Sequence, residues 1–227
     1  MSDEVKWKVG TRFLNNPTGE EIWLHMDDGN MGGGEEIIEK DVTGFYKKDG
    51  DDNDFYDYKW GNGWDRDSNG NINPGTNLHF SLDRWGKFHY CLFANDAEHS
   101  SGSNHMGISE YDPGEFNDDF IIGDDNWHMS IPEIVTGIFG LSGVTLCPKG
   151  SYSTVQAAIF MHELGHNLGL KFTGGYQITG DEGYEPYGHH SCMNYYYILS
   201  YVDYAGSEWN TVQNRVSDIG VELNGVD

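Results

Sequence analysis

The sequence predicts an α+β fold, in which a mixed β-sheet is combined with helices. Three observations indicate this class. Residues 153–166 carry apolar side chains at the spacing of a helix that is buried along one face. Residues 21–26 alternate polar and apolar side chains, as a half-buried strand does. Residues 87–94 include an apolar run that is typical of a central strand.

The remaining strands are expected to be short. Residues 76–82, 106–109 and 119–123 each contain apolar residues bounded by polar or glycine-rich segments, which is typical of strands. Residues 42–58 mix aromatic with acidic side chains, and we expect them to form a packed loop insertion.

Helices are expected on either side of these strands. Residues 5–15 have apolar side chains on neighbouring helical turns, and Pro17 lies just beyond the end of this pattern. Pro132 suits the first turn of a helix over residues 131–141. A closing helix is expected to begin with Ser207 as its N-cap. Its inward-facing residues would be Trp209, Val212 and Val216.

The composition is strongly acidic. Thirty-seven acidic residues against 13 basic ones give a formal charge of −24. This charge opposes binding to nucleic acids and to anionic membrane surfaces. A solvated acidic surface that keeps the protein soluble explains most of the carboxylates. No apolar stretch is long enough to suggest a membrane span, and the oligomeric state is not indicated.

Three cysteines, Cys91, Cys147 and Cys192, allow at most one internal disulfide. Cys192 is expected to be either a small core residue or one half of that disulfide.

The strongest functional signal is the motif H-E-x-x-H at residues 162–166. Two histidines four residues apart lie on one face of a helix, so both imidazoles can reach the same metal ion. We therefore expect His162 and His166 to bind Zn²⁺. Glu163 is offset around the helix and is expected to be the general base for a water molecule.

A second metal signal lies in the segment from Asp65 to Asn73. Its pattern, D-x-D-x-N-G-x-I-N, is typical of calcium loops in which oxygens at alternate positions converge on the ion. The acidic twelfth residue of such loops is absent, because position 76 is threonine. The alternative is an Asn-Gly turn between two short strands. The candidate calcium ligands are Asp65, Asp67, Asn69, Asn71 and Asn73.

The residues that follow the motif extend it. Gly169 comes three residues after His166, and Met193 lies downstream within the sequence Ser191 to Tyr195. With these residues the chain resembles the metzincin metallopeptidases, and most of all their ulilysin/pappalysin-type branch. The resemblance is loose from about residue 9 to 197 and specific only between residues 161 and 195.

This resemblance implies a zinc endopeptidase with a two-lobed, single catalytic domain over residues 1–227. An upper lobe, to about residue 169, would hold the sheet and the active-site helix. A small irregular lower lobe, from about 170 to 227, would hold the turn with Met193. An extended peptide or protein substrate would pair with an edge strand, either 106–109 or 119–123. Tyr195 would donate a hydrogen bond to the oxyanion of the transition state.

The resemblance also implies a secreted protein that is processed to its mature form, because the chain starts without a secretory signal. A cytoplasmic protein of a halophile is the alternative that the acidic composition leaves open.

The family's third zinc ligand is not matched. Three residues after Gly169 stands Phe172, which cannot bind zinc. His190 is our first candidate for a substitute ligand. The other candidates are His189, Asp181, Tyr195 and, in a differently built site, Glu208. The alternative function is a peptidase-like binding or structural protein without a complete zinc site.

Overall fold

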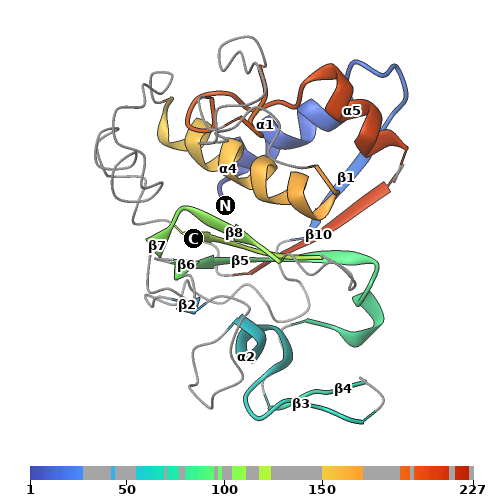
Figure 1. Ribbon diagram of the computed structural model, residues 1–227, viewed down its shortest axis with the longest axis vertical. Coiled ribbons are helices and arrows are strands. Elements are labelled where there is room, and N and C mark those ends of the chain that lie inside the picture. The colour runs from blue at the N-terminus through green and yellow to red at the C-terminus, as the bar shows by residue number, and fades with distance from the viewer. Residues whose placement is uncertain are drawn as a thin grey trace, which may run out of the picture. The chain divides into compact units, whose positions relative to one another are not determined.

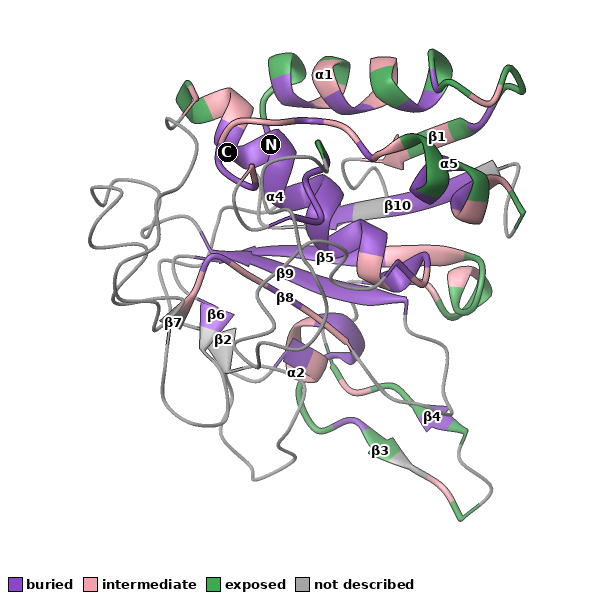
Figure 2. Ribbon diagram, turned by 45° about the horizontal axis from the view of Figure 1, so that its top comes forward, coloured by how far each residue is buried: buried purple, intermediate pink, exposed green. Residues whose placement is uncertain are grey.

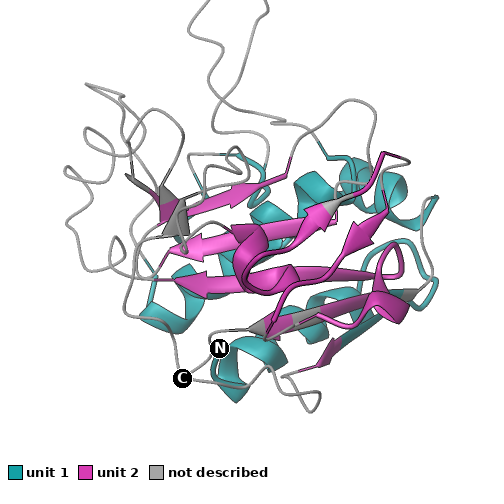
Figure 3. Cartoon of the chain, turned by 90° about the horizontal axis from the view of Figure 1, so that it is seen from below, with its two compact units in different colours: residues 1–25, 127–219 teal, residues 26–126, 220–227 magenta. Residues whose placement is uncertain are grey.

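A computed structural model of the chain (Figure 1) describes residues 1–27, 42–43, 55–68, 71–76, 80–94, 97–98, 104–110, 118–123, 150–170, 190–194, 197–214 and 218–224. The predicted helix at 131–141, together with Cys147, lies outside these residues. The chain divides into two compact units (Figure 3). Unit 1 comprises residues 1–25 and 127–219, and unit 2 comprises residues 26–126 and 220–227.

Unit 1 is built from three helices among its described residues. They are α1 (Asp3–Leu14), α4 (Tyr152–Asn167) and α5 (Gly206–Gln213). The helices predicted near residues 5–15 and 153–166 are thereby confirmed. Ser2 and Ser151 are the N-caps of α1 and α4, and each side chain accepts a hydrogen bond from a backbone N–H of the first turn.

Helices α1 and α4 lie side by side. The Lys8 ammonium group of α1 donates to the hydroxyls of Ser153, at 2.7 Å, and Thr154, at 3.1 Å. The inward face of α1 consists of Val5, Val9 and Phe13, all of them fully buried. The apolar stripe therefore packs as its helical period predicts, and the opposite side of α1 is exposed (Figure 2).

Helix α5 buries Trp209 and Val212, as predicted, but Ser207 is not its N-cap. The helix begins at Gly206, with Ala205 in the N-cap position, two residues before the predicted one. Alanine has no side-chain acceptor. Instead, the Glu208 carboxylate turns back and accepts a hydrogen bond from the Ala205 N–H at 2.7 Å. The cap is therefore supplied from inside the helix. Val216 lies outside the described residues.

The main sheet has the strand order β1-β10-β5-β9-β8. Its strands are β1 (Trp23–Asp27), β5 (Phe88–Ala94), β8 (Gly107–Ser109), β9 (Asp119–Gly123) and β10 (Asp218–Asn224). Strand β5 is central and runs parallel to β9 and β10, whereas β8 is antiparallel to β9 and lies at the edge. The α+β class and the mixed sheet are thus confirmed, and β10 was not predicted.

Smaller elements of unit 2 complete its described part. They are β2 (Val42–Thr43), α2 (Phe55–Trp60), β3 (Asp65–Arg66), β4 (Ile72–Asn73), the 3₁₀ helix η1 (Leu82–Arg84), β6 (Ala97–Glu98) and β7 (Asn104–His105). Buried residues of α2 and of the sheet form one apolar cluster that includes Phe55, Phe80 and Tyr90. The aromatic region expected to be a packed loop therefore contains a helix at its end.

The strand predicted over residues 76–82 is wrong in its described part. Thr76 forms only an isolated bridge with Asn62, and Leu82 begins η1. Phe80 is fully buried, but its ring packs edge-to-face on Trp60 and Tyr90. Phe80 is therefore buried through ring packing, although it does not belong to a strand.

None of the helices in the described part of the chain has both the length and the apolar character that crossing a bilayer requires.

Candidate metal centre

Helix α4 brings the two histidines of the motif together at one point on its surface. His162 and His166 are one helical turn apart, and their Nε2 atoms lie 3.1 Å from each other. The rings are nearly perpendicular, with centroids 4.6 Å apart. His162 is buried, with only 2% of its surface exposed, and His166 is partly buried. The juxtaposition expected from the four-residue spacing is therefore present.

The other nitrogen of each ring faces a backbone carbonyl. His162 Nδ1 lies 2.8 Å from the Cys192 carbonyl oxygen, and His166 Nδ1 lies 2.9 Å from that of Leu170. A carbonyl oxygen only accepts hydrogen bonds, so these contacts place a proton on each Nδ1. In a neutral imidazole the lone pair is then on Nε2. Histidines that bind metals are oriented in this way.

Two lone pairs that face each other at 3.1 Å repel unless a positive centre lies near both. In a tetrahedral zinc site with Zn–N bonds of about 2.0–2.1 Å, two imidazole nitrogens are about 3.3 Å apart. The observed separation is within a few tenths of an ångström of that value. Burial lowers the pKa of both rings, and for His162 the nearby His166 lowers it further. The neutral, metal-binding form is thus favoured, and imidazole nitrogen is a donor of the kind that Zn²⁺ takes.

Glu163, the expected general base, is buried with 6% of its surface exposed. Glu163 directly follows His162 and precedes His166 by three residues. All three motif residues therefore belong to the same two turns of α4.

Gly169 ends the helix and redirects the chain. Its φ angle is +82°, in the left-handed region that glycine tolerates without strain. The Leu170 N–H donates to the Gly165 carbonyl at 2.8 Å, and the Leu170 carbonyl then faces His166. Gly169 therefore lets the helix end and turns the chain back towards it.

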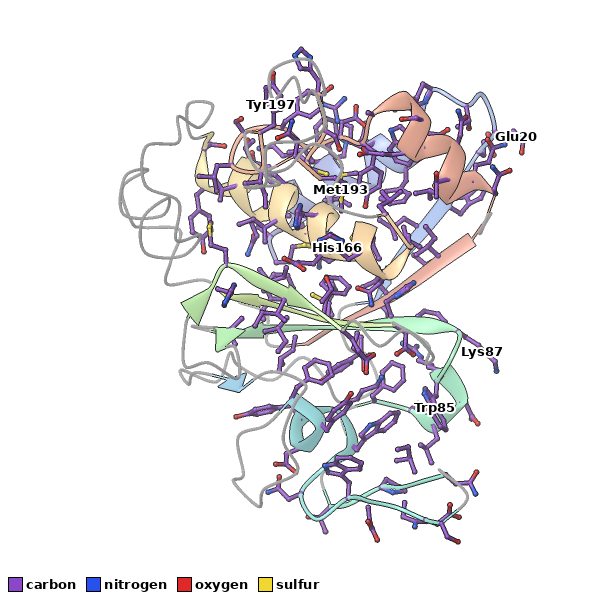
Figure 4. All side chains as sticks on the ribbon, viewed as in Figure 1. Glu20, Trp85, Lys87, His166, Met193 and Tyr197 are labelled. Carbon is purple, nitrogen blue, oxygen red and sulfur yellow. The ribbon has the colours of Figure 1, made fainter. Side chains whose placement is uncertain are left out.

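The turn with Met193 lies against α4 (Figure 4). A Cβ atom added to Gly165 would lie 2.5 Å from the Met193 sulfur, so only glycine allows this approach without a shift. Cys192 and Met193 are both fully buried. Cys192 is a free cysteine, so it is the small core residue that was one of our two expectations.

The third ligand is not identified within the described residues. Phe172, Asp181, His189 and Tyr195 lie outside them. His190 is exposed, and its ring packs edge-to-face on Tyr197, with centroids 4.9 Å apart. The ligand roles of these candidates, and the oxyanion role of Tyr195, stay predictions. The Glu208 carboxylate accepts hydrogen bonds from the Ser191 hydroxyl and the Ala205 N–H.

The candidate calcium segment forms a hairpin in its described part. Strands β3 and β4 are antiparallel, and Asp65 pairs with Asn73. The Asp67 carboxylate accepts two hydrogen bonds from Asn71, one from its N–H and one from its side-chain amide, both at 2.9 Å. Asn69 lies outside the described residues. The short strands match the alternative that we considered, and calcium binding stays a prediction.

Sequence reasoning missed a buried charge cluster in unit 2. Lys59 of α2 contacts both carboxylate oxygens of Asp119, at 2.5 and 2.7 Å, and one of Asp118, at 3.8 Å. Carboxylate oxygens of Glu110, Asp118 and Asp119 lie within 4.8 Å of one another. Burial raises the pKa of all three carboxyl groups. The pair Asp118-Asp119 before an apolar run was the available signal, while Lys59 is too distant in sequence to be linked to it.

Comparison of the chain with models of protein families, with curated proteins and with solved structures found no match. The assignment of a function therefore rests on the residues and geometry described above.

Proposed function

We propose that this chain is a zinc-dependent endopeptidase. One observation carries the proposal: a buried and a partly buried imidazole present their Nε2 atoms to each other at 3.1 Å while both Nδ1 atoms are held by backbone carbonyls. The metzincin resemblance of the residues around the motif adds the reaction class. The proposed substrate is an extended peptide or protein segment, and the proposed location is outside the cell.

The residues of α4 have separate roles in this proposal. His162 and His166 would hold the ion, and a third ligand would come from beyond Gly169. When bound, Zn²⁺ acidifies water and polarises the carbonyl of the scissile peptide. Glu163 takes the proton of the attacking water and carries it to the leaving amine. Burial of Glu163 suits this task, because it limits competing contacts with bulk water.

The test combines metal content with cleavage of a denatured protein such as casein. Glu163→Gln should retain zinc and reduce cleavage by at least about 100-fold, because it removes the base but no ligand. His166→Ala should lose both zinc and cleavage. Glu20→Gln changes an exposed glutamate and is the control, with no effect expected. Cleavage by Glu163→Gln at the wild-type rate would refute the proposal.

A second candidate function is that of a binding or structural protein that has this helix but does not hydrolyse peptide bonds. Phe172, at the position of the family's third ligand, favours it. The two candidates differ in a simple measurement. One zinc ion per chain with chelator-sensitive cleavage supports the enzyme, whereas neither property supports the binding protein.

We also propose that the segment from Asp65 to Asn73 binds Ca²⁺ through oxygens of Asp65, Asp67, Asn69, Asn71 and Asn73. Calorimetric titration with Ca²⁺ tests this, with Asp67→Ala expected to abolish the signal. No heat of binding in the wild type would exclude the site.

A further inference from the structure

The peptide group between Cys192 and Met193 is held at both of its ends. Its carbonyl oxygen faces His162 Nδ1 at 2.8 Å. Its N–H, which belongs to Met193, donates to the Ser191 hydroxyl oxygen at 3.0 Å. Because a peptide group is planar, fixing the N–H also fixes the direction of the carbonyl. The orientation of His162 therefore depends on where the Ser191 side chain lies.

Ser191 is in turn held by a carboxylate. Its hydroxyl donates to Glu208 of α5, and the same carboxylate oxygen accepts the Ala205 N–H at 2.7 Å. Four groups thus form one chain of hydrogen bonds: the His162 imidazole, the peptide 192–193, the Ser191 hydroxyl and the Glu208 carboxylate. Ser191, Cys192 and Met193 are fully buried and Glu208 is 3% exposed.

The three hydrogen bonds of this chain all point the same way. Nδ1–H donates to the carbonyl, the peptide N–H to the hydroxyl oxygen, and the hydroxyl to the carboxylate. Aligned hydrogen bonds polarise one another, and the effect is larger where water is excluded. A carbonyl whose own N–H is engaged in this way is a better acceptor. It draws the Nδ1 proton and leaves more electron density on Nε2.

We propose that Glu208 is a positioning residue that orients and polarises His162 through Ser191 and the peptide 192–193, and so strengthens metal binding. The inference rests on the proposed function, since it takes His162 as a ligand. It extends the carboxylate–histidine–zinc arrangement, in which a carboxylate contacts the histidine directly. Here a serine and one peptide group are interposed.

The alternative role of Glu208 is only to cap α5 at Ala205. Two substitutions separate the roles. Ser191→Ala breaks the relay and leaves the bond from Ala205 to Glu208 in place. Glu208→Gln keeps an oxygen acceptor for both donors and removes the negative charge. Ser207→Ala changes an exposed hydroxyl in the same helix and is the control.

The first measurement is Zn²⁺ affinity, determined by competition with a chromophoric chelator. Changes to groups that orient metal ligands weaken binding by about 10- to 100-fold, and we expect about 10-fold for both Ser191→Ala and Glu208→Gln. The control should bind as the wild type does. The thermal midpoint of each variant shows whether its fold is retained.

The second measurement is NMR of the Nδ1–H protons in metal-free protein. The His162 signal should move upfield in both variants, since its hydrogen bond weakens. The His166 signal should stay, because that ring donates to Leu170 and lies outside the relay. A purely structural role would not shift one histidine selectively.

The outcomes are distinct. Wild-type zinc affinity in both variants, with an unmoved His162 signal, would overturn the relay and leave the peptidase proposal intact. Failure of the wild type to bind Zn²⁺ would overturn both. A selective His162 shift with weakened zinc binding supports the relay.

Discussion

Gly165 is a residue of α4 against which the Met193 turn packs closely. An added Cβ would meet the Met193 sulfur at 2.5 Å, a Tyr204 ring carbon at 3.1 Å and a Leu170 methyl at 3.3 Å. Tyr204 has little freedom to move, because its hydroxyl donates to the Met161 carbonyl at 2.6 Å. The absence of a side chain at this position is therefore part of the site.

We expect Gly165→Ala to destabilise the fold by about 1–3 kcal/mol, because overpacking outweighs the gain of up to about 1 kcal/mol in helix propensity. Gly206→Ala is the matched control, since a Cβ there meets nothing within 4 Å. Urea unfolding of both variants gives the comparison. Equal stability of the two variants would mean that the Met193 turn can shift at little cost in free energy.

His89 is a residue whose protonation should affect stability. Burial, with a smaller contribution from the Lys59 charge, lowers its pKa from 6.5 to about 4. Its Nδ1 atom is buried and has no hydrogen-bond partner in the part of the chain that the structure describes. The folded state therefore disfavours the imidazolium that forms readily in the unfolded chain.

The lowered pKa of His89 determines how the stability of the fold changes with pH. Between pH 6.5 and about 4 the unfolded chain binds the proton more readily, so stability falls as the solution becomes more acidic. The difference corresponds to about 3 kcal/mol. We expect the wild type to lose about that much more than His89→Gln between pH 7 and pH 4. Parallel stability curves for the two proteins would contradict this.

At the scale of elements, α2 and β9 are joined by a buried ion pair. Only 1% of the Lys59 side chain is exposed, and its ammonium lies over the rings of Trp60 and Phe80, 4.6 Å from each centroid. Its positive charge balances part of the negative charge of Glu110, Asp118 and Asp119.

Lys59→Met should therefore destabilise the protein by about 3–5 kcal/mol at neutral pH, because it leaves buried carboxylates without this partner. Adding Asp119→Asn to the Lys59→Met variant should restore part of the lost stability. Lys87→Met, at an exposed lysine, should change stability by less than about 0.5 kcal/mol. Urea titrations of the wild type, Lys59→Met, Asp119→Asn and the double variant give the double-mutant cycle, and additive effects would argue against direct coupling.

Helices whose apolar side chains recur at a clear helical spacing could be predicted from the sequence. Elements whose conformation depends on tertiary contacts could not. Helices α1 and α4 have long apolar stripes and serine caps. Helix α2 has six residues, too few to show a period, and it is held by burial of Phe55 and Trp60. Strand β10 was missed although Ile219, Val221 and Leu223 alternate and are all buried.

In the candidate site, too, the features set by sequence spacing could be predicted, and those set by tertiary contacts could not. The four-residue spacing predicted the meeting of the two imidazoles. It gave no indication of the carbonyls of Leu170 and Cys192, because their directions depend on the left-handed Gly169 and on the Ser191 hydrogen bonds. The role of Glu208 likewise depends on a contact across 17 residues of sequence.

At the scale of the whole molecule, the net charge of −24 is the dominant property. Like charges on a folded surface repel one another more than in the expanded chain, and salt screens this repulsion. The acidic excess should therefore make stability depend on ionic strength.

We expect the thermal midpoint to rise between 50 mM and 1 M salt, by about 2–4 °C for each kcal/mol gained. NaCl and KCl should act alike if screening is the cause. A midpoint that falls with either salt would show that surface ion pairs, such as Arg84 with Asp27, outweigh the repulsion.

Both units are assembled from segments that are far apart in the chain, since residues 220–227 belong with 26–126 and residues 1–25 with 127–219. Strand β10 occupies an interior place in the sheet, between β1 and β5. A ribosome must therefore have translated through residue 224 before β5 acquires this neighbour. Until then one side of β5 has unpaired backbone donors and acceptors, which is the kind of open strand edge at which a nascent polypeptide can pair wrongly.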